Sequence, residues 1–223
     1  MAANPNSSLL AIERAHMVEE QLRQRGVRDE RVLEAMGTVP REEFVVERYR
    51  DQAYADHPLP IPLGQTVSQP FIVARMIEAA EVKSGTKVLE VGSGTGYEAA
   101  VLAEMGANVF TVERHAELAA IARMNLERMG YGKVVVETAD GSEGYMQEAP
   151  FEAILVAAAV PDIPPALFEQ LAEGGRLVIP IGPPDLQVLS LVKKQNRKMV
   201  MNRLEDCRFV PLIGNQGYAP AKP

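Results

Sequence analysis

Cysteine is nearly absent from this sequence, and long apolar runs are absent altogether. Cys207 is the only cysteine, so no intramolecular disulfide and no cysteine-based metal site can form. The longest apolar run, Ala153 to Val160, has the length of a strand and falls short of the roughly 18 residues that a membrane span needs. The stretch from Met1 to Ser8 lacks the basic-then-apolar order of a secretory leader. We therefore expect a cytoplasmic protein with no membrane partner.

Histidines and basic residues are also scarce. The three histidines, His16, His57 and His115, fall in no spacing typical of a catalytic triad or a metal site, so no metal is expected. Lys and Arg total 23 against 30 Asp and Glu, and the net charge of −7 disfavours nucleic-acid binding. The only basic cluster, within residues 193–198, is interpreted as a solvated turn between two strands.

The first part of the chain predicts helices followed by a proline-rich loop. Apolar residues recur at roughly helical spacing from Leu9 to Tyr49, with a short helix expected over Glu30–Met36 and another start at Pro40. Prolines at positions 58, 60, 62 and 70 exclude a helix or a central strand over residues 51–70. Ordered loops of this length are usually functional. A helix over Phe71–Ala80 is expected to follow.

From Lys87 onward, apolar strands alternate with helices. The expected strands are Lys87–Val91, Asn108–Val112, Val134–Thr138, Phe151–Val156 and Arg176–Pro180. The expected helices are Tyr97–Met105, Ala116–Met129 and Pro164–Leu171. This alternation predicts an α/β protein with a Rossmann-like, doubly wound, mostly parallel sheet. Two further segments, Val188–Lys193 and Lys198–Arg208, are expected to form a C-terminal antiparallel hairpin.

A glycine-rich loop, Gly92-Ser93-Gly94-Thr95-Gly96, joins the first of these strands to its helix. Glycines allow a tight turn and close approach of a ligand, and the free amides of the next helix suit a nucleotide cofactor. The dinucleotide fingerprint G-x-G-x-x-G is not matched, because the third glycine comes early and Tyr97 occupies its place. Glu90 would repel a pyrophosphate but suits the cationic groups of S-adenosylmethionine. The predicted cofactor ligands here are Glu90, Gly92, Ser93, Gly94 and Gly96.

Acidic residues follow the next two strands. Glu113 lies roughly twenty residues beyond the glycine loop, where an acid accepts hydrogen bonds from ribose hydroxyls. Asp140 and Gly141 follow the third strand, within expected reach of the adenine. Open α/β sheets bind ligands at the carboxyl ends of their strands, so we expect Glu90, Glu113 and Asp140 to meet there.

Several motifs extend this pattern over most of the chain, from about Met17 to Leu212. They are Val39-Pro40-Arg41-Glu42-Glu43-Phe44-Val45, Tyr54-Ala55-Asp56, Gly64-Gln65-Thr66-Val67-Ser68-Gln69-Pro70, Val88 to Tyr97, Gly174 to Gly182, and Arg208-Phe209-Val210-Pro211-Leu212. In these motifs the sequence resembles the bacterial protein-L-isoaspartate O-methyltransferases. The glycine loop occurs in many methyltransferases, whereas Gln65 to Pro70 distinguishes this family.

The resemblance implies methyl transfer from S-adenosylmethionine to the free α-carboxylate of L-isoaspartyl residues in damaged proteins, which starts their repair and leaves S-adenosylhomocysteine. It implies that Ser68 is an active-site residue and that Thr66, Val67 and Ser68 lie at the cofactor. We interpret Ser68 as a donor that orients the substrate carboxylate, although it could also cap the helix beginning near Pro70. One departure is Ala157, near the place where the family usually has a threonine.

The expected organisation is a single methyltransferase domain over residues 1–223. It comprises a helical extension and substrate loop (9–80), a cofactor-binding core (81–182) and a C-terminal hairpin and tail (183–218). A monomer is expected, because arbitrary protein surfaces need an open site. Two alternatives are a methyltransferase of the same fold acting on another carboxylate or small molecule, and an NAD-dependent oxidoreductase. Gln65 to Pro70 argues against the first, and Tyr97 with Glu90 against the second.

Overall fold

Seven strands form one sheet in the computed structural model, which describes residues 5–220 and side chains from Ser8 onward. The first residues of the stretch Met1–Ser8 therefore lie outside the described part. In spatial order the strands are β5 (Val135–Thr138), β4 (Asn108–Glu113), β3 (Lys87–Val91), β6 (Phe151–Val156), β7 (Leu171–Ile181), β8 (Gln187–Gln195) and β9 (Lys198–Cys207). The first five are parallel and the last two add an antiparallel hairpin. The doubly wound sheet with its C-terminal hairpin is thus confirmed.

The strand order reverses between β3 and β6. From β3 the chain proceeds outward through β4 and β5, then returns to the other side of β3 for β6 and β7. Loops therefore diverge at the carboxyl ends of β3 and β6 and leave a crevice there, which is the usual ligand site of an open α/β sheet.

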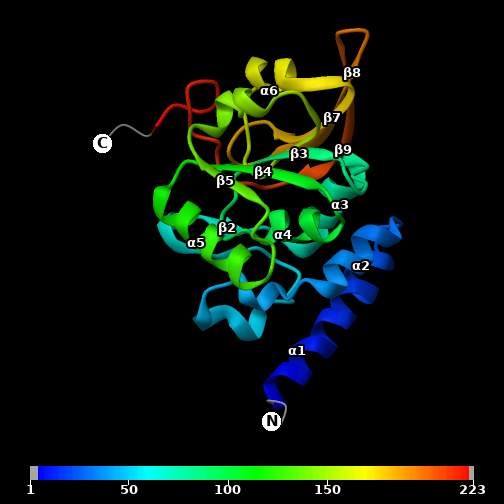
Figure 1. The fold of residues 1–223 in the computed structure, drawn as a ribbon. Helices are drawn as coiled ribbons and strands as arrows, with labels where there is room; N and C mark the ends of the chain where they lie inside the picture. The colour runs from blue at the N-terminus through cyan, green and yellow to red at the C-terminus, as the bar shows by residue number, and fades with distance from the viewer. Residues whose placement is uncertain (1–4, 221–223) are drawn as a thin grey trace.

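Helices cover both faces of the sheet. Figure 1 shows one face covered by α3 (Pro70–Ala80), α4 (Tyr97–Glu104) and α5 (Ala116–Arg128), and the other by α6 (Pro165–Gln170). Along β6, Ala153 and Leu155 pack in one hydrophobic cluster while Ile154 and Val156 pack in a second one. Burial on both faces explains why these strands are almost continuously apolar.

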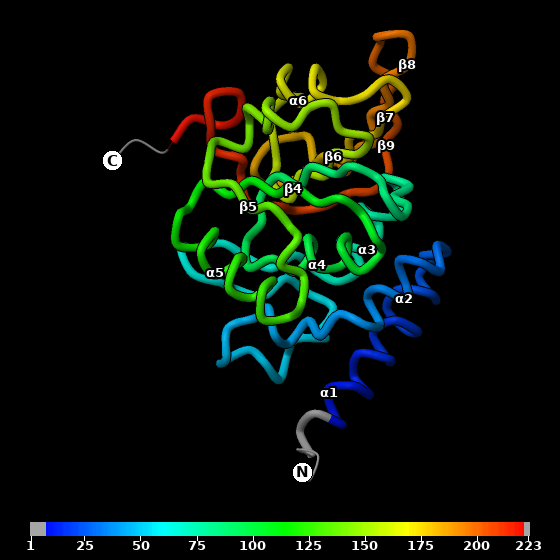
Figure 2. Tube along the Cα trace, in the orientation of Figure 1, coloured from blue at the N-terminus to red at the C-terminus, as the bar shows by residue number. Residues whose placement is uncertain are grey.

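The N-terminal extension packs beside the layer of α3, α4 and α5 and projects from it (Figure 2). Helix α1 (Pro5–His16) continues into a π-helical segment, Met17–Arg23, and α2 (Glu30–Thr38) contacts α3 and α4. Two expectations were wrong here. Helix α2 runs through Gly37 to Thr38, whose hydroxyl donates to the Glu34 carbonyl at 2.9 Å.

The second correction concerns Pro40. It begins only a 3-10 turn, Arg41–Glu43, and no longer helix. Phe44, the residue after the turn (φ −109°, ψ −1°), buries its ring edge-on against Tyr97, with centroids 5.8 Å apart. The chain thus packs against α4 directly after the turn.

The proline-rich segment folds as an ordered loop. It contains a 3-10 turn (Glu47–Gln52), β1 (Leu59–Pro60), a second turn (Pro62–Gly64) and β2 (Thr66–Val67). The two short strands pair antiparallel, with Leu59 opposite Val67. This small hairpin brings the segment before α3 to the carboxyl end of the main sheet, where Gln65 to Ser68 line the same cavity as the glycine loop. Two more 3-10 turns, Gly141–Glu143 and Met146–Glu148, follow β5.

Strand β7 is longer than predicted. It begins at Leu171 rather than Arg176 and includes the glycine pair Gly174-Gly175. The pairing slips between Phe151↔Leu171 and Ala153↔Arg176. A Cβ on Gly175 would lie 2.8 Å from the Ala172 carbonyl oxygen and 3.0 Å from that of Glu152. The glycine thus permits a bulge tighter than any side chain would allow.

Candidate active site

The glycine loop turns sharply because its glycines adopt positive φ. Gly92 has φ +99°, and Gly96, which precedes the first residue of α4, has φ +95°. A Cβ on Gly96 would lie 3.2 Å from Leu126 Cγ and 3.5 Å from Ala122 Cα of helix α5. Helix α5 can pack this closely against the loop only because position 96 carries no side chain.

Polar contacts hold the loop against the neighbouring strand and helix. The Gly94 amide donates to Glu113 Oε2 at 3.0 Å, and the His115 amide donates to Glu113 Oε1 at 3.0 Å. Asn125 of α5 donates to the Thr95 carbonyl at 3.0 Å. Glu113 therefore ties the ends of β3 and β4 together, and its oxygens retain lone pairs for further donors.

A cavity lies over these strand ends and brings together most of the predicted site residues. Its lining includes Thr66, Val67, Ser68, Glu90, Gly92, Ser93, Gly94, Glu113 and Gly141. The C-terminal segment after β9 forms another part of the wall with Pro211, Leu212 and Ile213. Figure 2 shows this segment running back across the sheet from β9. Ala157 also lines the cavity. A Cβ placed on Gly92 would lie 3.6 Å from the Cβ of Ala157, so this part of the wall is apolar.

Gly96 and Asp140 are predicted ligands that are not among the residues lining this cavity. Gly96 lies beneath the loop, against α5. Asp140 Oδ1 accepts hydrogen bonds from the amide and hydroxyl of Ser142 at 2.9 and 2.7 Å, and Oδ2 accepts from the Asn215 amide at 2.7 Å. Burial alone would raise the pKa of Asp140, but these hydrogen bonds outweigh it and hold the pKa below its usual value. The observed contacts of Asp140 anchor the C-terminal segment, and its reach to an adenine stays a prediction.

Glu90 meets a second buried carboxyl that sequence reasoning missed. Glu90 is 1% exposed, and burial raises its pKa to about 8. Glu98, the second residue of α4, is 6% exposed and lines the same cavity. Burial, and then the charge of Glu90, raises the pKa of Glu98 well above its usual value. A signal was present, because Glu98 interrupts an otherwise apolar run from Tyr97 to Leu102 that is buried throughout.

A buried arginine supports the Ser68 segment. Arg41 is fully buried, donating from Nε to the Ala53 carbonyl at 2.8 Å and from Nη2 to the Ser68 carbonyl at 2.7 Å. Its guanidinium lies 4.7 Å from the centroid of the Tyr97 ring, and burial lowers its pKa. The residue preceding α3 is Gln69, without a side-chain capping bond, so Ser68 does not cap that helix.

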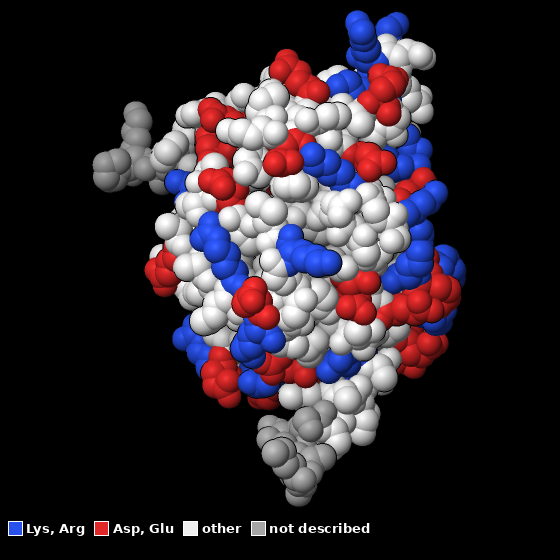
Figure 3. Space-filling view, in the orientation of Figure 1, with Lys and Arg blue, Asp and Glu red and all other residues white. Residues whose placement is uncertain are grey.

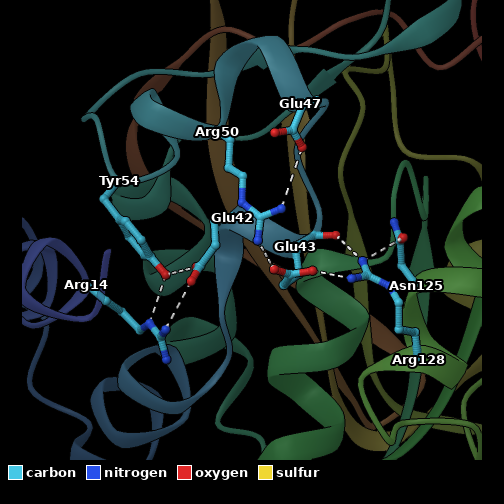
Figure 4. A network of polar contacts seen from close by, with 8 residues as sticks. All are labelled: Arg14, Glu42, Glu43, Glu47, Arg50, Tyr54, Asn125 and Arg128. Atoms are coloured by element: carbon cyan, nitrogen blue, oxygen red, sulfur yellow. Dashed lines mark hydrogen bonds and ion pairs between the residues drawn. The ribbon is translucent and has the colours of Figure 1, made fainter. Parts of the chain in front are cut away.

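The two acids after Arg41 connect the extension to the core. In Figure 4, Glu42 accepts from Tyr54 and Arg14, while Glu43 binds Arg50 and Arg128. Arg128 of α5 also donates to the Glu43 carbonyl at 2.8 Å and to Asn125 Oδ1 at 3.3 Å. Because Asn125 holds the glycine loop, this network leads from the extension to that loop.

Within the described residues, no group of three or more His, Cys, Asp or Glu side chains is placed to hold a metal ion. The helices of residues 5–220 include none that is both long and apolar enough to cross a membrane. Figure 3 shows acidic and basic side chains interspersed over one face, with basic side chains at the tip of the β8–β9 hairpin.

The sequence model of the protein-L-isoaspartate(D-aspartate) O-methyltransferase family matches residues 12–217. The chain belongs to this family. It is 66% identical over 222 residues to the protein-L-isoaspartate O-methyltransferase of Koribacter versatilis (strain Ellin345), covering 100% of both chains. It is 50% identical to protein-L-isoaspartate O-methyltransferase 1 of Syntrophobacter fumaroxidans (strain DSM 10017 / MPOB), covering 92% of this chain and 96% of the relative.

Solved structures of the family have the same fold. One protein-L-isoaspartate O-methyltransferase superposes with a TM-score of 0.83 at 33% identity, over 91% of this chain and 67% of the other. The Plasmodium falciparum beta-aspartate methyltransferase, crystallised with S-adenosyl-L-homocysteine, superposes with a TM-score of 0.78 at 29% identity. That match covers 91% of this chain and 99% of the other.

Proposed function

We propose that this chain transfers a methyl group from S-adenosylmethionine to the free α-carboxylate of L-isoaspartyl residues in damaged proteins and peptides, which initiates their repair. One observation carries the proposal. A single cavity joins the glycine loop and Glu113 to Gln65–Ser68, part of a motif in which the sequence resembles this family.

The residues around the cavity fit the proposed cofactor. Glu90 Oε2 and Thr95 Oγ1 are buried without a hydrogen-bond partner among the described residues, so a polar ligand would satisfy them. Glu113 stands at the end of β4, where an acid suits ribose hydroxyls. The carboxylates match a ligand that carries an ammonium and a sulfonium group. When bound, S-adenosylmethionine supplies a methyl group that its sulfonium sulfur already activates.

The proposed reaction demands positioning more than proton transfer. A substrate carboxylate has a pKa near 4 and is ionised at neutral pH, so no strong base is required. Orientation of reacting groups can supply about 7–11 kcal/mol in favourable cases. We assign this task to Ser68, whose hydroxyl would donate to the substrate carboxylate. Arg41 supports it by fixing the Ser68 carbonyl, and Val67 and Leu212 give the cavity apolar walls.

Paired peptides provide the test. The chain is incubated with labelled S-adenosylmethionine and two peptides that differ only in carrying aspartate or isoaspartate at one position. We expect label in the isoaspartyl peptide alone, as a base-labile ester. Equal labelling of both peptides, or labelling of neither, would contradict the proposal. Activity on a small carboxylic acid instead would favour the alternative methyltransferase.

An NAD-dependent oxidoreductase is disfavoured by packing. Tyr97 occupies the place of the third fingerprint glycine, is 2% exposed, and lies between Phe44 and Arg41. A monomeric state, a cytoplasmic location, the absence of nucleic-acid partners and the residue ranges assigned to each segment stay predictions. Sedimentation of the purified chain would test the first.

A further inference from the structure

Two buried carboxyl groups share the cofactor cavity. Glu90 comes from β3 and Glu98 from the first turn of α4, and the cavity lining includes both. Each leaves one oxygen, Glu90 Oε2 and Glu98 Oε1, without a hydrogen-bond partner among the described residues. Buried polar atoms are rarely left unpaired in a folded protein, so these oxygens point to a ligand.

The surroundings do not neutralise this pair. The Thr111 side chain and the Ala99 amide act to lower the pKa of Glu90, but burial outweighs them and the nearby charge of Glu113 also raises it. The other charged or titratable side chains lining the cavity are Tyr97, Arg114 and His115. No ion pair to Glu90 or Glu98 is found within residues 8–220.

The buried cation Arg41 makes no ion pair with Glu90 or Glu98. Arg41 lies over the Tyr97 ring and donates to backbone carbonyls. Two neighbouring carboxylates in a dry site cannot both ionise without a large cost. In the absence of a cation, the pair is therefore expected to retain a proton at neutral pH.

We propose that Glu98, together with Glu90, forms a proton-holding pair that selects the cationic cofactor over its neutral product. The inference rests on the proposed function, which supplies this cofactor. S-adenosylmethionine and S-adenosylhomocysteine share an ammonium and a carboxylate, and they differ in charge only at sulfur. Binding the sulfonium ion expels the proton of the pair to solvent, and the pair regains one proton once the sulfur is neutral. Methyl transfer to a carboxylate itself neither consumes nor releases a proton.

A purely structural role for Glu98 makes a different prediction. An acid in the first turn of a helix interacts favourably with the helix dipole, which would account for helix stability alone. Glu117 provides a control for this helix-dipole effect. It is the second residue of α5, as Glu98 is of α4, but its side chain is exposed and lies outside the cavity. Glu117→Gln therefore makes the same charge change at the same helical position, without touching the pair.

Calorimetry tests the proposal directly. S-adenosylmethionine and S-adenosylhomocysteine are titrated into wild type, Glu98→Gln and Glu117→Gln near neutral pH, in buffers of different ionisation enthalpy, to count released protons. Wild type and Glu117→Gln should release close to one proton with S-adenosylmethionine and far less with S-adenosylhomocysteine. Glu98→Gln should lower the affinity ratio of cofactor to product by about tenfold, equivalent to 1.4 kcal/mol, while it still binds the product.

Several outcomes would overturn the inference. One is an unchanged affinity ratio in Glu98→Gln, and another is a wild-type protein that releases no proton with either ligand. Equal proton release with both ligands would assign the pair to the shared ammonium and would also overturn it. If Glu98→Gln does not fold, the proton count of the wild type still decides. Failure of wild type to bind S-adenosylmethionine at all would instead refute the proposed function.

Discussion

Raising the pH should destabilise the cofactor-free protein through Glu90 and Glu98. An unfolded glutamate titrates near 4.5, whereas burial raises the pKa of Glu90 in the folded chain to about 8. Between these values the folded state holds a proton that the unfolded state has lost, so stability falls as pH rises. Each pH unit in this window removes up to about 1.4 kcal/mol per group. From about pH 5.5 to about pH 7.5, Glu90 alone therefore removes about 2.5 kcal/mol.

Urea unfolding of wild type and of the double variant Glu90→Gln/Glu98→Gln, at several pH values across this window, measures the effect. The amides have similar shape and do not titrate, so the double variant should lack this slope while other groups contribute equally to both proteins. Glu117→Gln should keep the wild-type slope, because this side chain is exposed. Parallel pH profiles for wild type and the double variant would refute the reasoning, since they would mean that neither carboxyl holds an extra proton in the folded state.

Three further substitutions test other parts of the site. Ser68→Ala should lower kcat/KM for an isoaspartyl peptide by about tenfold or more, the size of a hydrogen bond to a charged group, with cofactor affinity nearly unchanged; a wild-type rate would exclude its assigned role. Gly96→Ala should lower the free energy of unfolding by about 1–2 kcal/mol because of the positive φ at this position, and the contact with Leu126 should add strain. A urea midpoint equal to that of the wild type would contradict this prediction. Asp140→Asn should speed proteolysis after Leu212, because a neutral amide holds Ser142 and Asn215 less well; an unchanged cleavage rate would show that the anchor lies elsewhere.

Local sequence determined much of this protein. The strand and helix alternation after Lys87 follows from burial of both sheet faces, which makes the strands continuously apolar and sets them apart from the helices between them. The sequence predicted the tight turn of the glycine loop, because positive φ and the close approach of α5 at Gly96 both require glycine. The place of Glu113 beside the glycine loop was predictable because the ends of parallel strands meet at one edge of the sheet.

Tertiary structure decided the features that depend on partners distant in the chain. A sequence does not state that Phe44 packs on Tyr97, or that the strand pairing slips at Gly175. Asp140 follows its strand as expected, yet its carboxylate binds the segment at Asn215, which packing alone brings there.

The same distinction applies to the acids of the cavity. Glu90 could be singled out because it directly precedes a recognisable loop. Glu98 gave a weaker signal, an acid within an apolar run, because an acid in the first turn of a helix is ordinary until the helix is buried against the sheet. Sequence alone predicted where the cofactor site lies, because the glycine loop and the acids after the strands are local signals. The folded chain decided which charges are removed from water there, because burial depends on every element packed around the site.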